Sequence, residues 1–302
     1  MLRWYASAGL FAIGLVAAGL VRAENWPCWR GQRGDGTSEE KQVPLRWNGV
    51  SGENIVWKTP LPGRGHSSPI VWGDRLFLVA CVEASQSRIV FCVDRPTGQI
   101  LWQRTVISAP LERRHNLNSF ASGTPATDGE LVYATFLEPD FGSKKEATPG
   151  NLVVAAYDLA GNPRWLVRPG RFSSVHGFCS SPVLFEDQVI VNGDHDGDSY
   201  IVALDRKTGE IRWKTPRPNK TRSYCTPIIR EMDGRTQMIL SGSLCVVSMD
   251  PRDGSQHWII DGPTEQFVAS LVYNGQLLFL TAGFPEHHIL AIKPDGRGNV
   301  TH

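Results

Sequence analysis

The stretch Asp205-Arg206-Lys207-Thr208-Gly209-Glu210-Ile211-Arg212-Trp213 decides the fold of this 302-residue chain. The apolar residues 200–204 precede it and predict a buried strand. The Asp side chain can hydrogen-bond backbone amides in a turn, and Gly209 can adopt the positive φ that such a turn needs. After the turn, Ile211 and Trp213 alternate with charged residues, as in a half-buried strand. The stretch therefore predicts a strand, a tight turn and a second strand that carries a tryptophan.

The same unit recurs along the chain. Three further copies run from an aspartate to a tryptophan seven or eight residues later, at Asp94–Trp102, Asp158–Trp165 and Asp250–Trp258. A serine or threonine followed by proline precedes each copy, at Ser68-Pro69, Thr124-Pro125, Ser181-Pro182 and Thr226-Pro227. A fifth copy begins at Ala269-Ser270 and reaches Ile292 without a following tryptophan. Internal repetition of this kind determines the architecture.

The spacing of the repeats identifies the unit. The repeat aspartates follow one another at 64, 47 and 45 residues, and about 45 residues with several short strands make one four-stranded propeller blade. In the third repeat we expect strands at 181–185, 188–192, 199–204 and 210–214. Two insertions, roughly 107–121 and 139–149, lengthen the first interval and are expected to be loops between strands, which often gather on one face.

The pattern apolar-Ala-Leu-Asp-x-x-Thr-Gly-x-x-x-Trp resembles the repeat of pyrroloquinoline quinone (PQQ)-type β-propellers. The resemblance covers residues 55–292 and includes four copies in register with the Ser/Thr-Pro marker. It implies an all-β propeller of four-stranded blades. The family includes quinoprotein dehydrogenases and non-catalytic scaffolds, such as the propeller lipoprotein of the outer-membrane assembly machinery, so the resemblance leaves the function open.

The number of blades follows from the fourth strands. Residues 54–58 are expected to form a lone fourth strand with its own tryptophan, Trp57, which precedes the next repeat tryptophan by 45 residues. Such a strand can pair into the last blade and close the ring. The chain then represents about five blades. The resembled family normally has seven or eight, and residues 294–298 read as a turn that enters a missing strand, so we expect a truncated ring with an exposed edge.

Three parts are expected along the chain. Residues 1–23 read as a secretory signal peptide, 24–53 as a lead-in segment and 54–302 as the propeller, incomplete at its C-terminus. An uncleaved anchor is the alternative, although the apolar run of about 15 residues is shorter than the roughly 20 that span a bilayer. We expect an exported protein, periplasmic or extracellular, with no membrane span after cleavage. The net charge of +1 gives no reason to expect nucleic acid as a partner.

The residues present once per repeat have a structural interpretation. The repeat aspartates are expected to hold turns, and the tryptophans to pack between blades. The aspartates are Asp94, Asp158, Asp205 and Asp250, and the tryptophans are Trp57, Trp102, Trp165, Trp213 and Trp258.

Candidate ligand-binding residues precede the first strands of three blades. His115 and Asn118 lie in the first insertion, while His176 and Tyr224 precede the next two Ser/Thr-Pro markers. If these loops share a face, the four side chains surround the mouth of the central opening, where a ligand site is expected in such a fold. A solvated surface loop is the alternative.

Acidic residues and cysteines offer weaker candidates. Asp194, Asp196 and Asp198 alternate as calcium ligands can, but a hairpin turn is the favoured interpretation. The six cysteines form no Cys-x-x-Cys motif. Cys81 and Cys92 are expected on consecutive strands, where they either form a disulfide or remain buried thiols.

Two classes of function follow. We prefer an exported, non-catalytic propeller that binds a cell-envelope protein or another ligand, without a cofactor. The alternative is a PQQ-dependent dehydrogenase that oxidises alcohols or sugars and needs calcium and an Asp base. The resembled enzymes have a pair of adjacent cysteines, which this sequence lacks. A hydrolytic propeller is a third possibility, for which the sequence offers no carboxylate pair that can be placed near a substrate.

Overall fold

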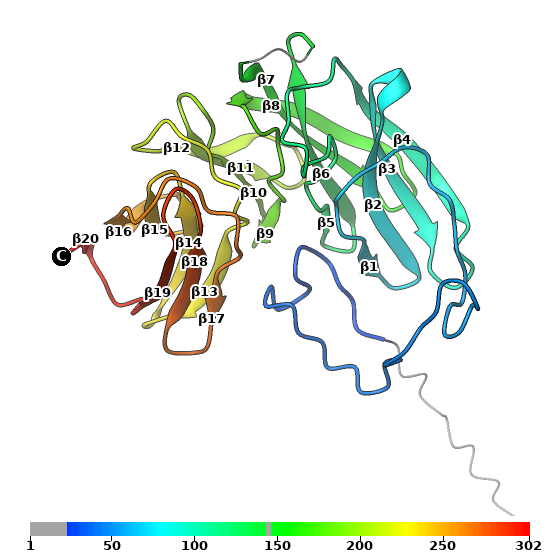
Figure 1. The fold of residues 1–302 in the computed structure, drawn as a ribbon, viewed down its shortest axis with the longest axis horizontal. Coiled ribbons are helices and arrows are strands. Elements are labelled where there is room, and N and C mark those ends of the chain that lie inside the picture. Colours follow the sequence, from blue (N-terminus) through cyan, green and yellow to red (C-terminus); the bar gives the residue numbers. More distant parts are fainter. Residues whose placement is uncertain (1–22, 143–145) are drawn as a thin grey trace, which may run out of the picture.

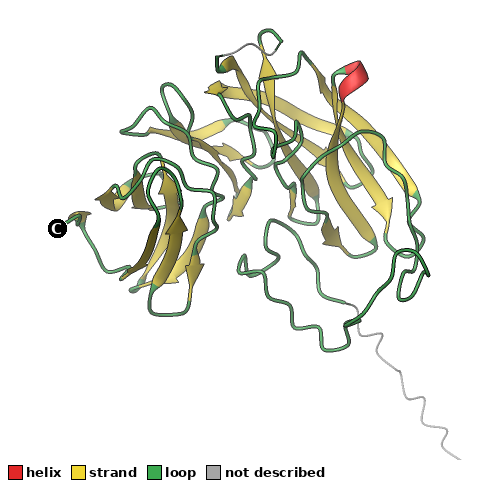
Figure 2. Ribbon diagram, in the orientation of Figure 1, coloured by secondary structure: helices red, strands yellow, loops and turns green. Residues whose placement is uncertain are grey.

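A computed structural model describes residues 23–142 and 146–302, and nearly all their regular structure is β (Figures 1 and 2). The strands form five separate sheets in chain order, and a short 3-10 turn occupies Glu83–Ser85. The predicted all-β propeller with about five blades is therefore confirmed. In the third repeat, every strand end lies within two residues of the prediction.

Each of the first three blades is an antiparallel sheet of four consecutive strands. The first blade comprises β1 (Ile70–Trp72), β2 (Arg75–Val82), β3 (Ser87–Asp94) and β4 (Ile100–Ser108). The second comprises β5 (Ala126–Thr127), β6 (Leu131–Pro139), β7 (Thr148–Asp158) and β8 (Pro163–Ser174). The third comprises β9 (Val183–Phe185), β10 (Gln188–Gly193), β11 (Tyr200–Asp205) and β12 (Ile211–Pro216).

The last two blades depart from this scheme. The fourth comprises β13 (Ile228–Met232), β14 (Arg235–Gly242), β15 (Cys245–Met249) and β16 (Gln256–Asp261), and β20 (Gly298–Asn299) adds to β16 in parallel. The fifth has three strands, β17 (Val272–Tyr273), β18 (Leu278–Ala282) and β19 (His288–Ile292). The strand that follows the turn at 294–298 thus joins the fourth blade instead of completing the fifth.

Most of the core lies between neighbouring blades. Phe77 and Val90 of the first blade pack with Val132 and Phe136 of the second. Similar clusters join the second blade to the third, the third to the fourth and the fourth to the fifth. The blades follow a curved path with β1, β5 and β9 on its inner side, and the ring is open between the fifth blade and the first (Figure 1).

A repeated contact links each of the first three blades to the next. The indole N–H of Trp165 donates to the Arg206 carbonyl oxygen at 3.0 Å, and the ring packs against Gly209. A Cβ on Gly209 would lie 2.8 Å from this ring, and its φ is +76°, so the turn needs glycine. The Asp205 carboxylate accepts the backbone amides of the same turn. The tryptophans of the other two early blades make the same bond, Trp102 to Leu159 and Trp213 to Pro251.

The predicted strand at residues 54–58 is not formed. The Trp57 side chain nevertheless docks as the other repeat tryptophans do, since its indole donates to the Arg95 carbonyl oxygen at 2.8 Å and packs against Gly98. The backbone stays irregular because no third strand lies beside it in the described part of the chain.

The structure decides between the two alternatives for Cys81 and Cys92, because it has thiols at both positions and no disulfide between them. Cys81 pairs across the sheet with Arg88, and Cys92 pairs with Phe77, so the two thiols lie in different rows of the same hairpin. Both are free and buried, as the alternative interpretation expected.

The lead-in segment crosses the inner ends of the blades. Trp26 forms a bridge to Val71, Pro27 accepts the Thr127 amide at 2.8 Å, and the Trp29 indole donates to Ser270 Oγ at 3.2 Å. The segment therefore contacts the first, second and fifth repeats. The predicted signal peptide, apart from Ala23, lies outside the described residues. Among residues 23–142 and 146–302, no helix has the length and apolar character needed to cross a bilayer.

Candidate functional site

A cavity of about 670 Å³ opens where the chain enters the first strands of successive blades. We call this cavity the mouth. The structure brings all four predicted ligand-binding residues to it. Its lining residues come from the loops that lead to the five blades and from the loop between β18 and β19; they are His66, His115, Leu117, Asn118, Ser122, His176, Cys179, Arg222, Tyr224, Gln266, Val268 and Phe284.

His176 joins the first insertion, which carries His115 and Asn118, to the loop before the fourth blade, which carries Tyr224. Its Nδ1 lies 2.8 Å from the Tyr224 hydroxyl, within hydrogen-bond distance. Its backbone carbonyl accepts the Asn118 amide side chain at 2.8 Å and the His115 backbone N–H at 3.1 Å. The His115 and His176 rings meet edge to face with centroids 5.5 Å apart. The four side chains therefore form one connected group.

The protonation states in this group are set by burial and nearby charge. Burial lowers the pKa of His176, and the Arg222 guanidinium and His115 lower it further. Burial raises the pKa of the Tyr224 hydroxyl well above its usual range. At neutral pH the mouth thus presents a neutral imidazole and a neutral phenol, which can donate and accept hydrogen bonds.

Arg222 is the cation of the mouth, and it already has carboxylate partners. It contacts Asp196, and its guanidinium also lies 3.3 Å from Glu265. Asp196 in addition accepts the Val175 amide at 3.1 Å. These contacts bind the loop before the third blade to the loop before the fourth.

The three aspartates predicted as weak metal candidates point to three different cations. Asp194 pairs with Arg217 at 3.0 Å, Asp196 with Arg222, and Asp198 with Lys220 at 2.6 Å. Across the described ranges, no three His, Cys, Asp or Glu side chains are arranged to hold a metal. The segment is a turn between β10 and β11, as the favoured interpretation held.

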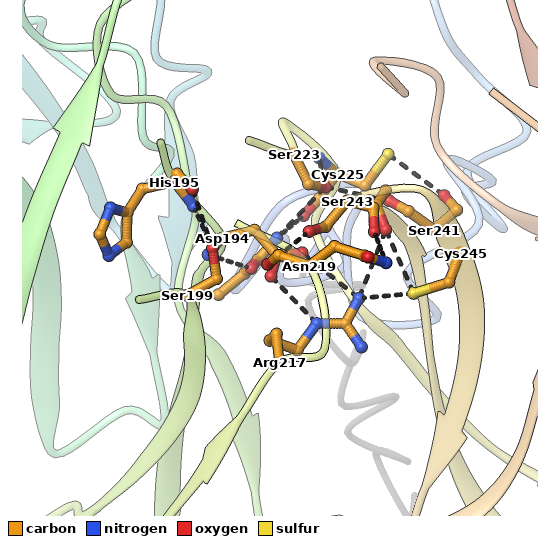
Figure 3. Close-up of polar contacts among 12 residues, drawn as sticks. Asp194, His195, Ser199, Arg217, Asn219, Ser223, Cys225, Ser241, Ser243 and Cys245 are labelled. Atoms are coloured by element: carbon orange, nitrogen blue, oxygen red, sulfur yellow. Dashed lines mark hydrogen bonds and ion pairs between the residues drawn. The ribbon is translucent and has the colours of Figure 1, made fainter. Parts of the chain in front are cut away.

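The Asp194–Arg217 pair belongs to a buried polar network between the third and fourth blades (Figure 3). Arg217 also donates to the Gly242 carbonyl oxygen at 3.4 Å, and Asn219 donates to the Ser243 carbonyl oxygen at 2.7 Å. The network fixes both ends of residues 217–225, because Ser223 Oγ donates to the Ser241 carbonyl oxygen at 3.0 Å. It thereby positions Arg222 and Tyr224.

A second buried ion pair positions the first insertion. Arg88 donates to Glu112 at 2.6 Å and to the carbonyl oxygens of Ala109 and Pro110, and both members of the pair are buried. The loop that carries His115 is therefore anchored to β3. Neither ion pair is predictable from the sequence, since neither arginine lies in a motif and each partner is distant in the sequence.

The rim of the mouth is apolar. Leu117 and Val268 are 79% and 72% exposed, and Phe284 is also exposed. Exposed apolar side chains around a recessed polar group are typical of a binding surface. The arrangement can accept an apolar side chain at the rim and hydrogen-bond a polar group below it.

The residues of the mouth do not fit a calcium-bound quinone. Calcium needs several oxygen ligands free to converge, but Asp196 and Glu265 are both paired with Arg222. Because these carboxylates neutralise the guanidinium of Arg222, it is not free for an anionic cofactor either.

Comparisons with known proteins agree with the fold. A family profile described as outer membrane protein assembly factor BamB matches residues 86–273. No curated protein matches the sequence. Similar solved structures include BamB from Moraxella catarrhalis (18% identity, 76% of this chain, 61% of that chain, TM-score 0.48) and a europium-containing methanol dehydrogenase (13% identity, 85% of this chain, 54% of that chain, TM-score 0.52).

The chain covers 61% and 54% of these two structures. At this level of identity the likeness to the dehydrogenase shows the fold alone. The profile carries the family assignment, because it covers more than half of the chain and includes the repeats from which the resemblance was first inferred. This protein therefore belongs to the family described as outer membrane protein assembly factor BamB.

Proposed function

We propose that this chain is an exported, non-catalytic propeller that binds a protein partner of the cell envelope at the mouth. The observation that carries the proposal is the apolar rim, Leu117, Val268 and Phe284, around the neutral His176–Tyr224 pair. The predicted signal peptide supports export. The family supports an envelope partner, since its description names outer-membrane protein assembly.

The chemistry of the mouth favours binding over catalysis. Interfaces between proteins combine exposed apolar anchors with polar groups that hydrogen-bond the partner. The Tyr224 hydroxyl and the His176 imidazole are neutral, and each can bond a partner's backbone. We propose that no cofactor is required.

The alternative is a quinoprotein dehydrogenase, which the propeller fold of the europium-containing methanol dehydrogenase favours. It would require Asp196 or Glu265 to leave Arg222 and act as a ligand or base. We therefore rank it second.

The test is site-specific photocrosslinking in cells that express the full chain. A photoreactive phenylalanine analogue replaces Leu117 or Val268, and in a control it replaces Ile211, an exposed apolar residue on β12. We expect both mouth positions to crosslink one envelope protein and the Ile211 position not to. Equal crosslinking from all three positions would contradict the proposal.

The enzymatic alternative is tested on the purified chain with PQQ and calcium. We expect no heat of binding in calorimetry and no dye reduction with alcohols or sugars. Saturable binding with turnover would overturn the non-catalytic assignment.

A further inference from the structure

Two imidazole rings of the mouth each have one ring nitrogen available to a partner. Nδ1 of His115 lies 3.2 Å from the Leu117 backbone nitrogen, and Nδ1 of His176 lies 2.8 Å from the Tyr224 hydroxyl. Among the residues that the structure describes, neither Nε2 atom has a hydrogen-bond partner. Both rings line the cavity, so what they offer a partner depends on which ring nitrogen carries the proton.

The contact with Leu117 determines where the proton of His115 lies. A backbone N–H is always a donor, so Nδ1 of His115 is the acceptor of the Leu117 amide and carries no proton. The proton of the neutral ring is therefore on Nε2. His115 thus presents an N–H donor to the mouth.

The contact with Tyr224 has the same consequence for His176. Burial raises the pKa of the Tyr224 phenol, and a hydrogen bond from Ser174 opposes this rise. A hydrogen bond lowers the pKa of a phenol when the phenol oxygen accepts it, so Ser174 donates to the Tyr224 oxygen. The phenol then donates its own proton to Nδ1 of His176, and the proton of the neutral ring lies on Nε2.

The charges beside the two rings do not favour an anion. Arg222 contacts Asp196, and its guanidinium lies 3.3 Å from Glu265. The charge of Arg113 also acts on His176, so two cations stand against two carboxylates. Because these charges cancel, nothing there compensates an anion for its loss of hydration. Neutral N–H donors in such surroundings favour an uncharged acceptor.

We propose that the mouth recognises uncharged backbone carbonyl oxygens of its partner through the Nε2–H donors of His115 and His176, with an apolar side chain beside them against the rim. Leu117, which is 79% exposed, follows His115 by two residues and supplies part of that rim. The inference rests on the proposed binding function and adds the chemistry of the partner. Carbonyl groups inside a helix or sheet are already paired, so the partner segment is a loop or an extended chain with unpaired carbonyls.

Nuclear magnetic resonance of the full chain with isotope-labelled histidine tests the donors. In the neutral form of each ring we expect the proton on Nε2 and none on Nδ1. Tyr224→Phe removes the hydroxyl that bonds Nδ1, so His176 should become a mixture of the two tautomers while His115 is unchanged. A proton on Nδ1 of either neutral ring in the unmodified chain would overturn the proposal.

Two small probes test the acceptor. N-acetyl-leucine methylamide is uncharged, and N-acetyl-leucine carries a carboxylate in place of the methylamide. We expect the methylamide to shift the ring signals of both histidines and to bind at least about tenfold more tightly than the acid. Equal or tighter binding of the acid, or no binding of the methylamide, would overturn the proposal. Neither probe involves the cellular partner, so this result and the crosslinking result can fail independently.

Substitution of His176 tests the contribution of one donor. His176→Leu removes the N–H, whereas His176→Gln keeps an N–H donor near the position of Nε2. We expect the affinity for the methylamide to fall about two- to tenfold in His176→Leu, the usual range for one hydrogen bond, and to be largely retained in His176→Gln. The matched control is His257→Leu on β16, whose ring lies 3.3 Å from the Thr236 carbonyl oxygen, and it should leave the affinity unchanged. Equal affinities of the two His176 variants, both folded by circular dichroism, would contradict the assignment.

Discussion

Residues 55–60 and β12 have nearly the same sequence and different structures. The two segments differ only at Val56, which corresponds to Arg212. Both tryptophans donate to a carbonyl oxygen of the next turn, Trp57 to Arg95 at 2.8 Å and Trp213 to Pro251 at 3.2 Å. Only β12 is a strand, because only β12 has a third strand, β11, beside it.

The difference separates two interactions that a propeller normally combines. Side-chain docking on the following turn depends on the tryptophan and the glycine of that turn, and it survives in both segments. Strand pairing depends on a neighbouring backbone and is present in one. The same local sequence is therefore a strand or an irregular segment according to its tertiary surroundings.

The largest expected effect comes from removal of the docked indole. Trp213→Ala should lower the free energy of unfolding by about 3 kcal/mol, the lower end of the range for large aromatic side chains, because Trp213 is partly buried. Trp57→Ala should cost roughly half as much, because the segment that it anchors contributes no strand pairing. Urea unfolding followed by circular dichroism measures both. Equal losses of unfolding free energy in the two variants would show that strand pairing adds nothing to the stability that the docked tryptophan contributes.

The turn glycines allow a finer comparison. A Cβ at Gly209 would lie 2.8 Å from Trp165, and one at Gly98 would lie 2.4 Å from Trp57, whereas Gly234 has a similar φ of +70° and nothing within 4 Å. Gly234→Ala should cost about 1 kcal/mol for backbone strain alone. Gly209→Ala should cost about 2–3 kcal/mol, because the indole lies on a paired strand and cannot move away.

Gly98→Ala should fall between these two values, since residues 55–60 can shift to relieve the contact. Chemical unfolding of the three variants ranks them. A Gly98→Ala loss as large as that of Gly209→Ala would mean that the unpaired segment is held as rigidly as β12.

The threonines two residues after the tryptophans should have equal effects. Thr59 Oγ1 donates to the Gly98 carbonyl oxygen at 2.6 Å, and Thr215 Oγ1 donates to the Gly254 carbonyl oxygen at 3.0 Å. Valine in either position should cost about 1 kcal/mol, the usual value for one hydrogen bond. Thermal unfolding of the two variants measures this. A loss confined to Thr215→Val would tie the bond to strand pairing.

The smallest effect is expected from Arg212→Val, which makes the two segments identical in sequence. Burial acts to raise the pKa of Asp205, but hydrogen bonds from Arg212 and from the amides of Thr208 and Lys207 outweigh it and hold the pKa at about 2. We expect β12 to remain a strand and the Asp205 pKa to rise toward 3.8, as NMR titration can show.

The sign of the pH effect follows from this lowered pKa. The carboxylate of Asp205 contributes stability above pH 3.8, and this contribution is lost as the pH falls from 3.8 toward 2. The variant should lose less stability over that interval. Loss of hydrogen-exchange protection in β12 of the variant would instead show that the arginine decides the strand.

The sequence was informative where the chemistry is local. The Asp–Gly turn and the alternation up to Trp213 predicted the strands of the third blade, because both depend on residues within one hairpin. The analogy among repeats also predicted that His115, His176 and Tyr224 lie together, and the structure places all three in the lining of one cavity. The pairing state of residues 54–58 was not predictable, since it depends on a strand elsewhere in the chain.

The same limit applies to the positioning of the mouth. The Arg88–Glu112 pair joins residues 24 positions apart and the Arg217–Asp194 pair residues 23 apart. Neither pair has a sequence motif, so only the folded arrangement reveals them. The two alternatives for Cys81 and Cys92 stayed open for a related reason, because cross-strand register is not contained in the spacing of these two residues.

The lead-in segment limits how far the open side of the molecule can widen. Trp26 is bridged to Val71 in the first blade, and Trp29 is hydrogen-bonded to Ser270 at the start of the fifth repeat. Trp29 follows Trp26 by three residues, and a backbone of this length spans at most roughly 10 Å. The two end blades are therefore tethered at their inner ends, and their outer ends have the greater freedom to move apart.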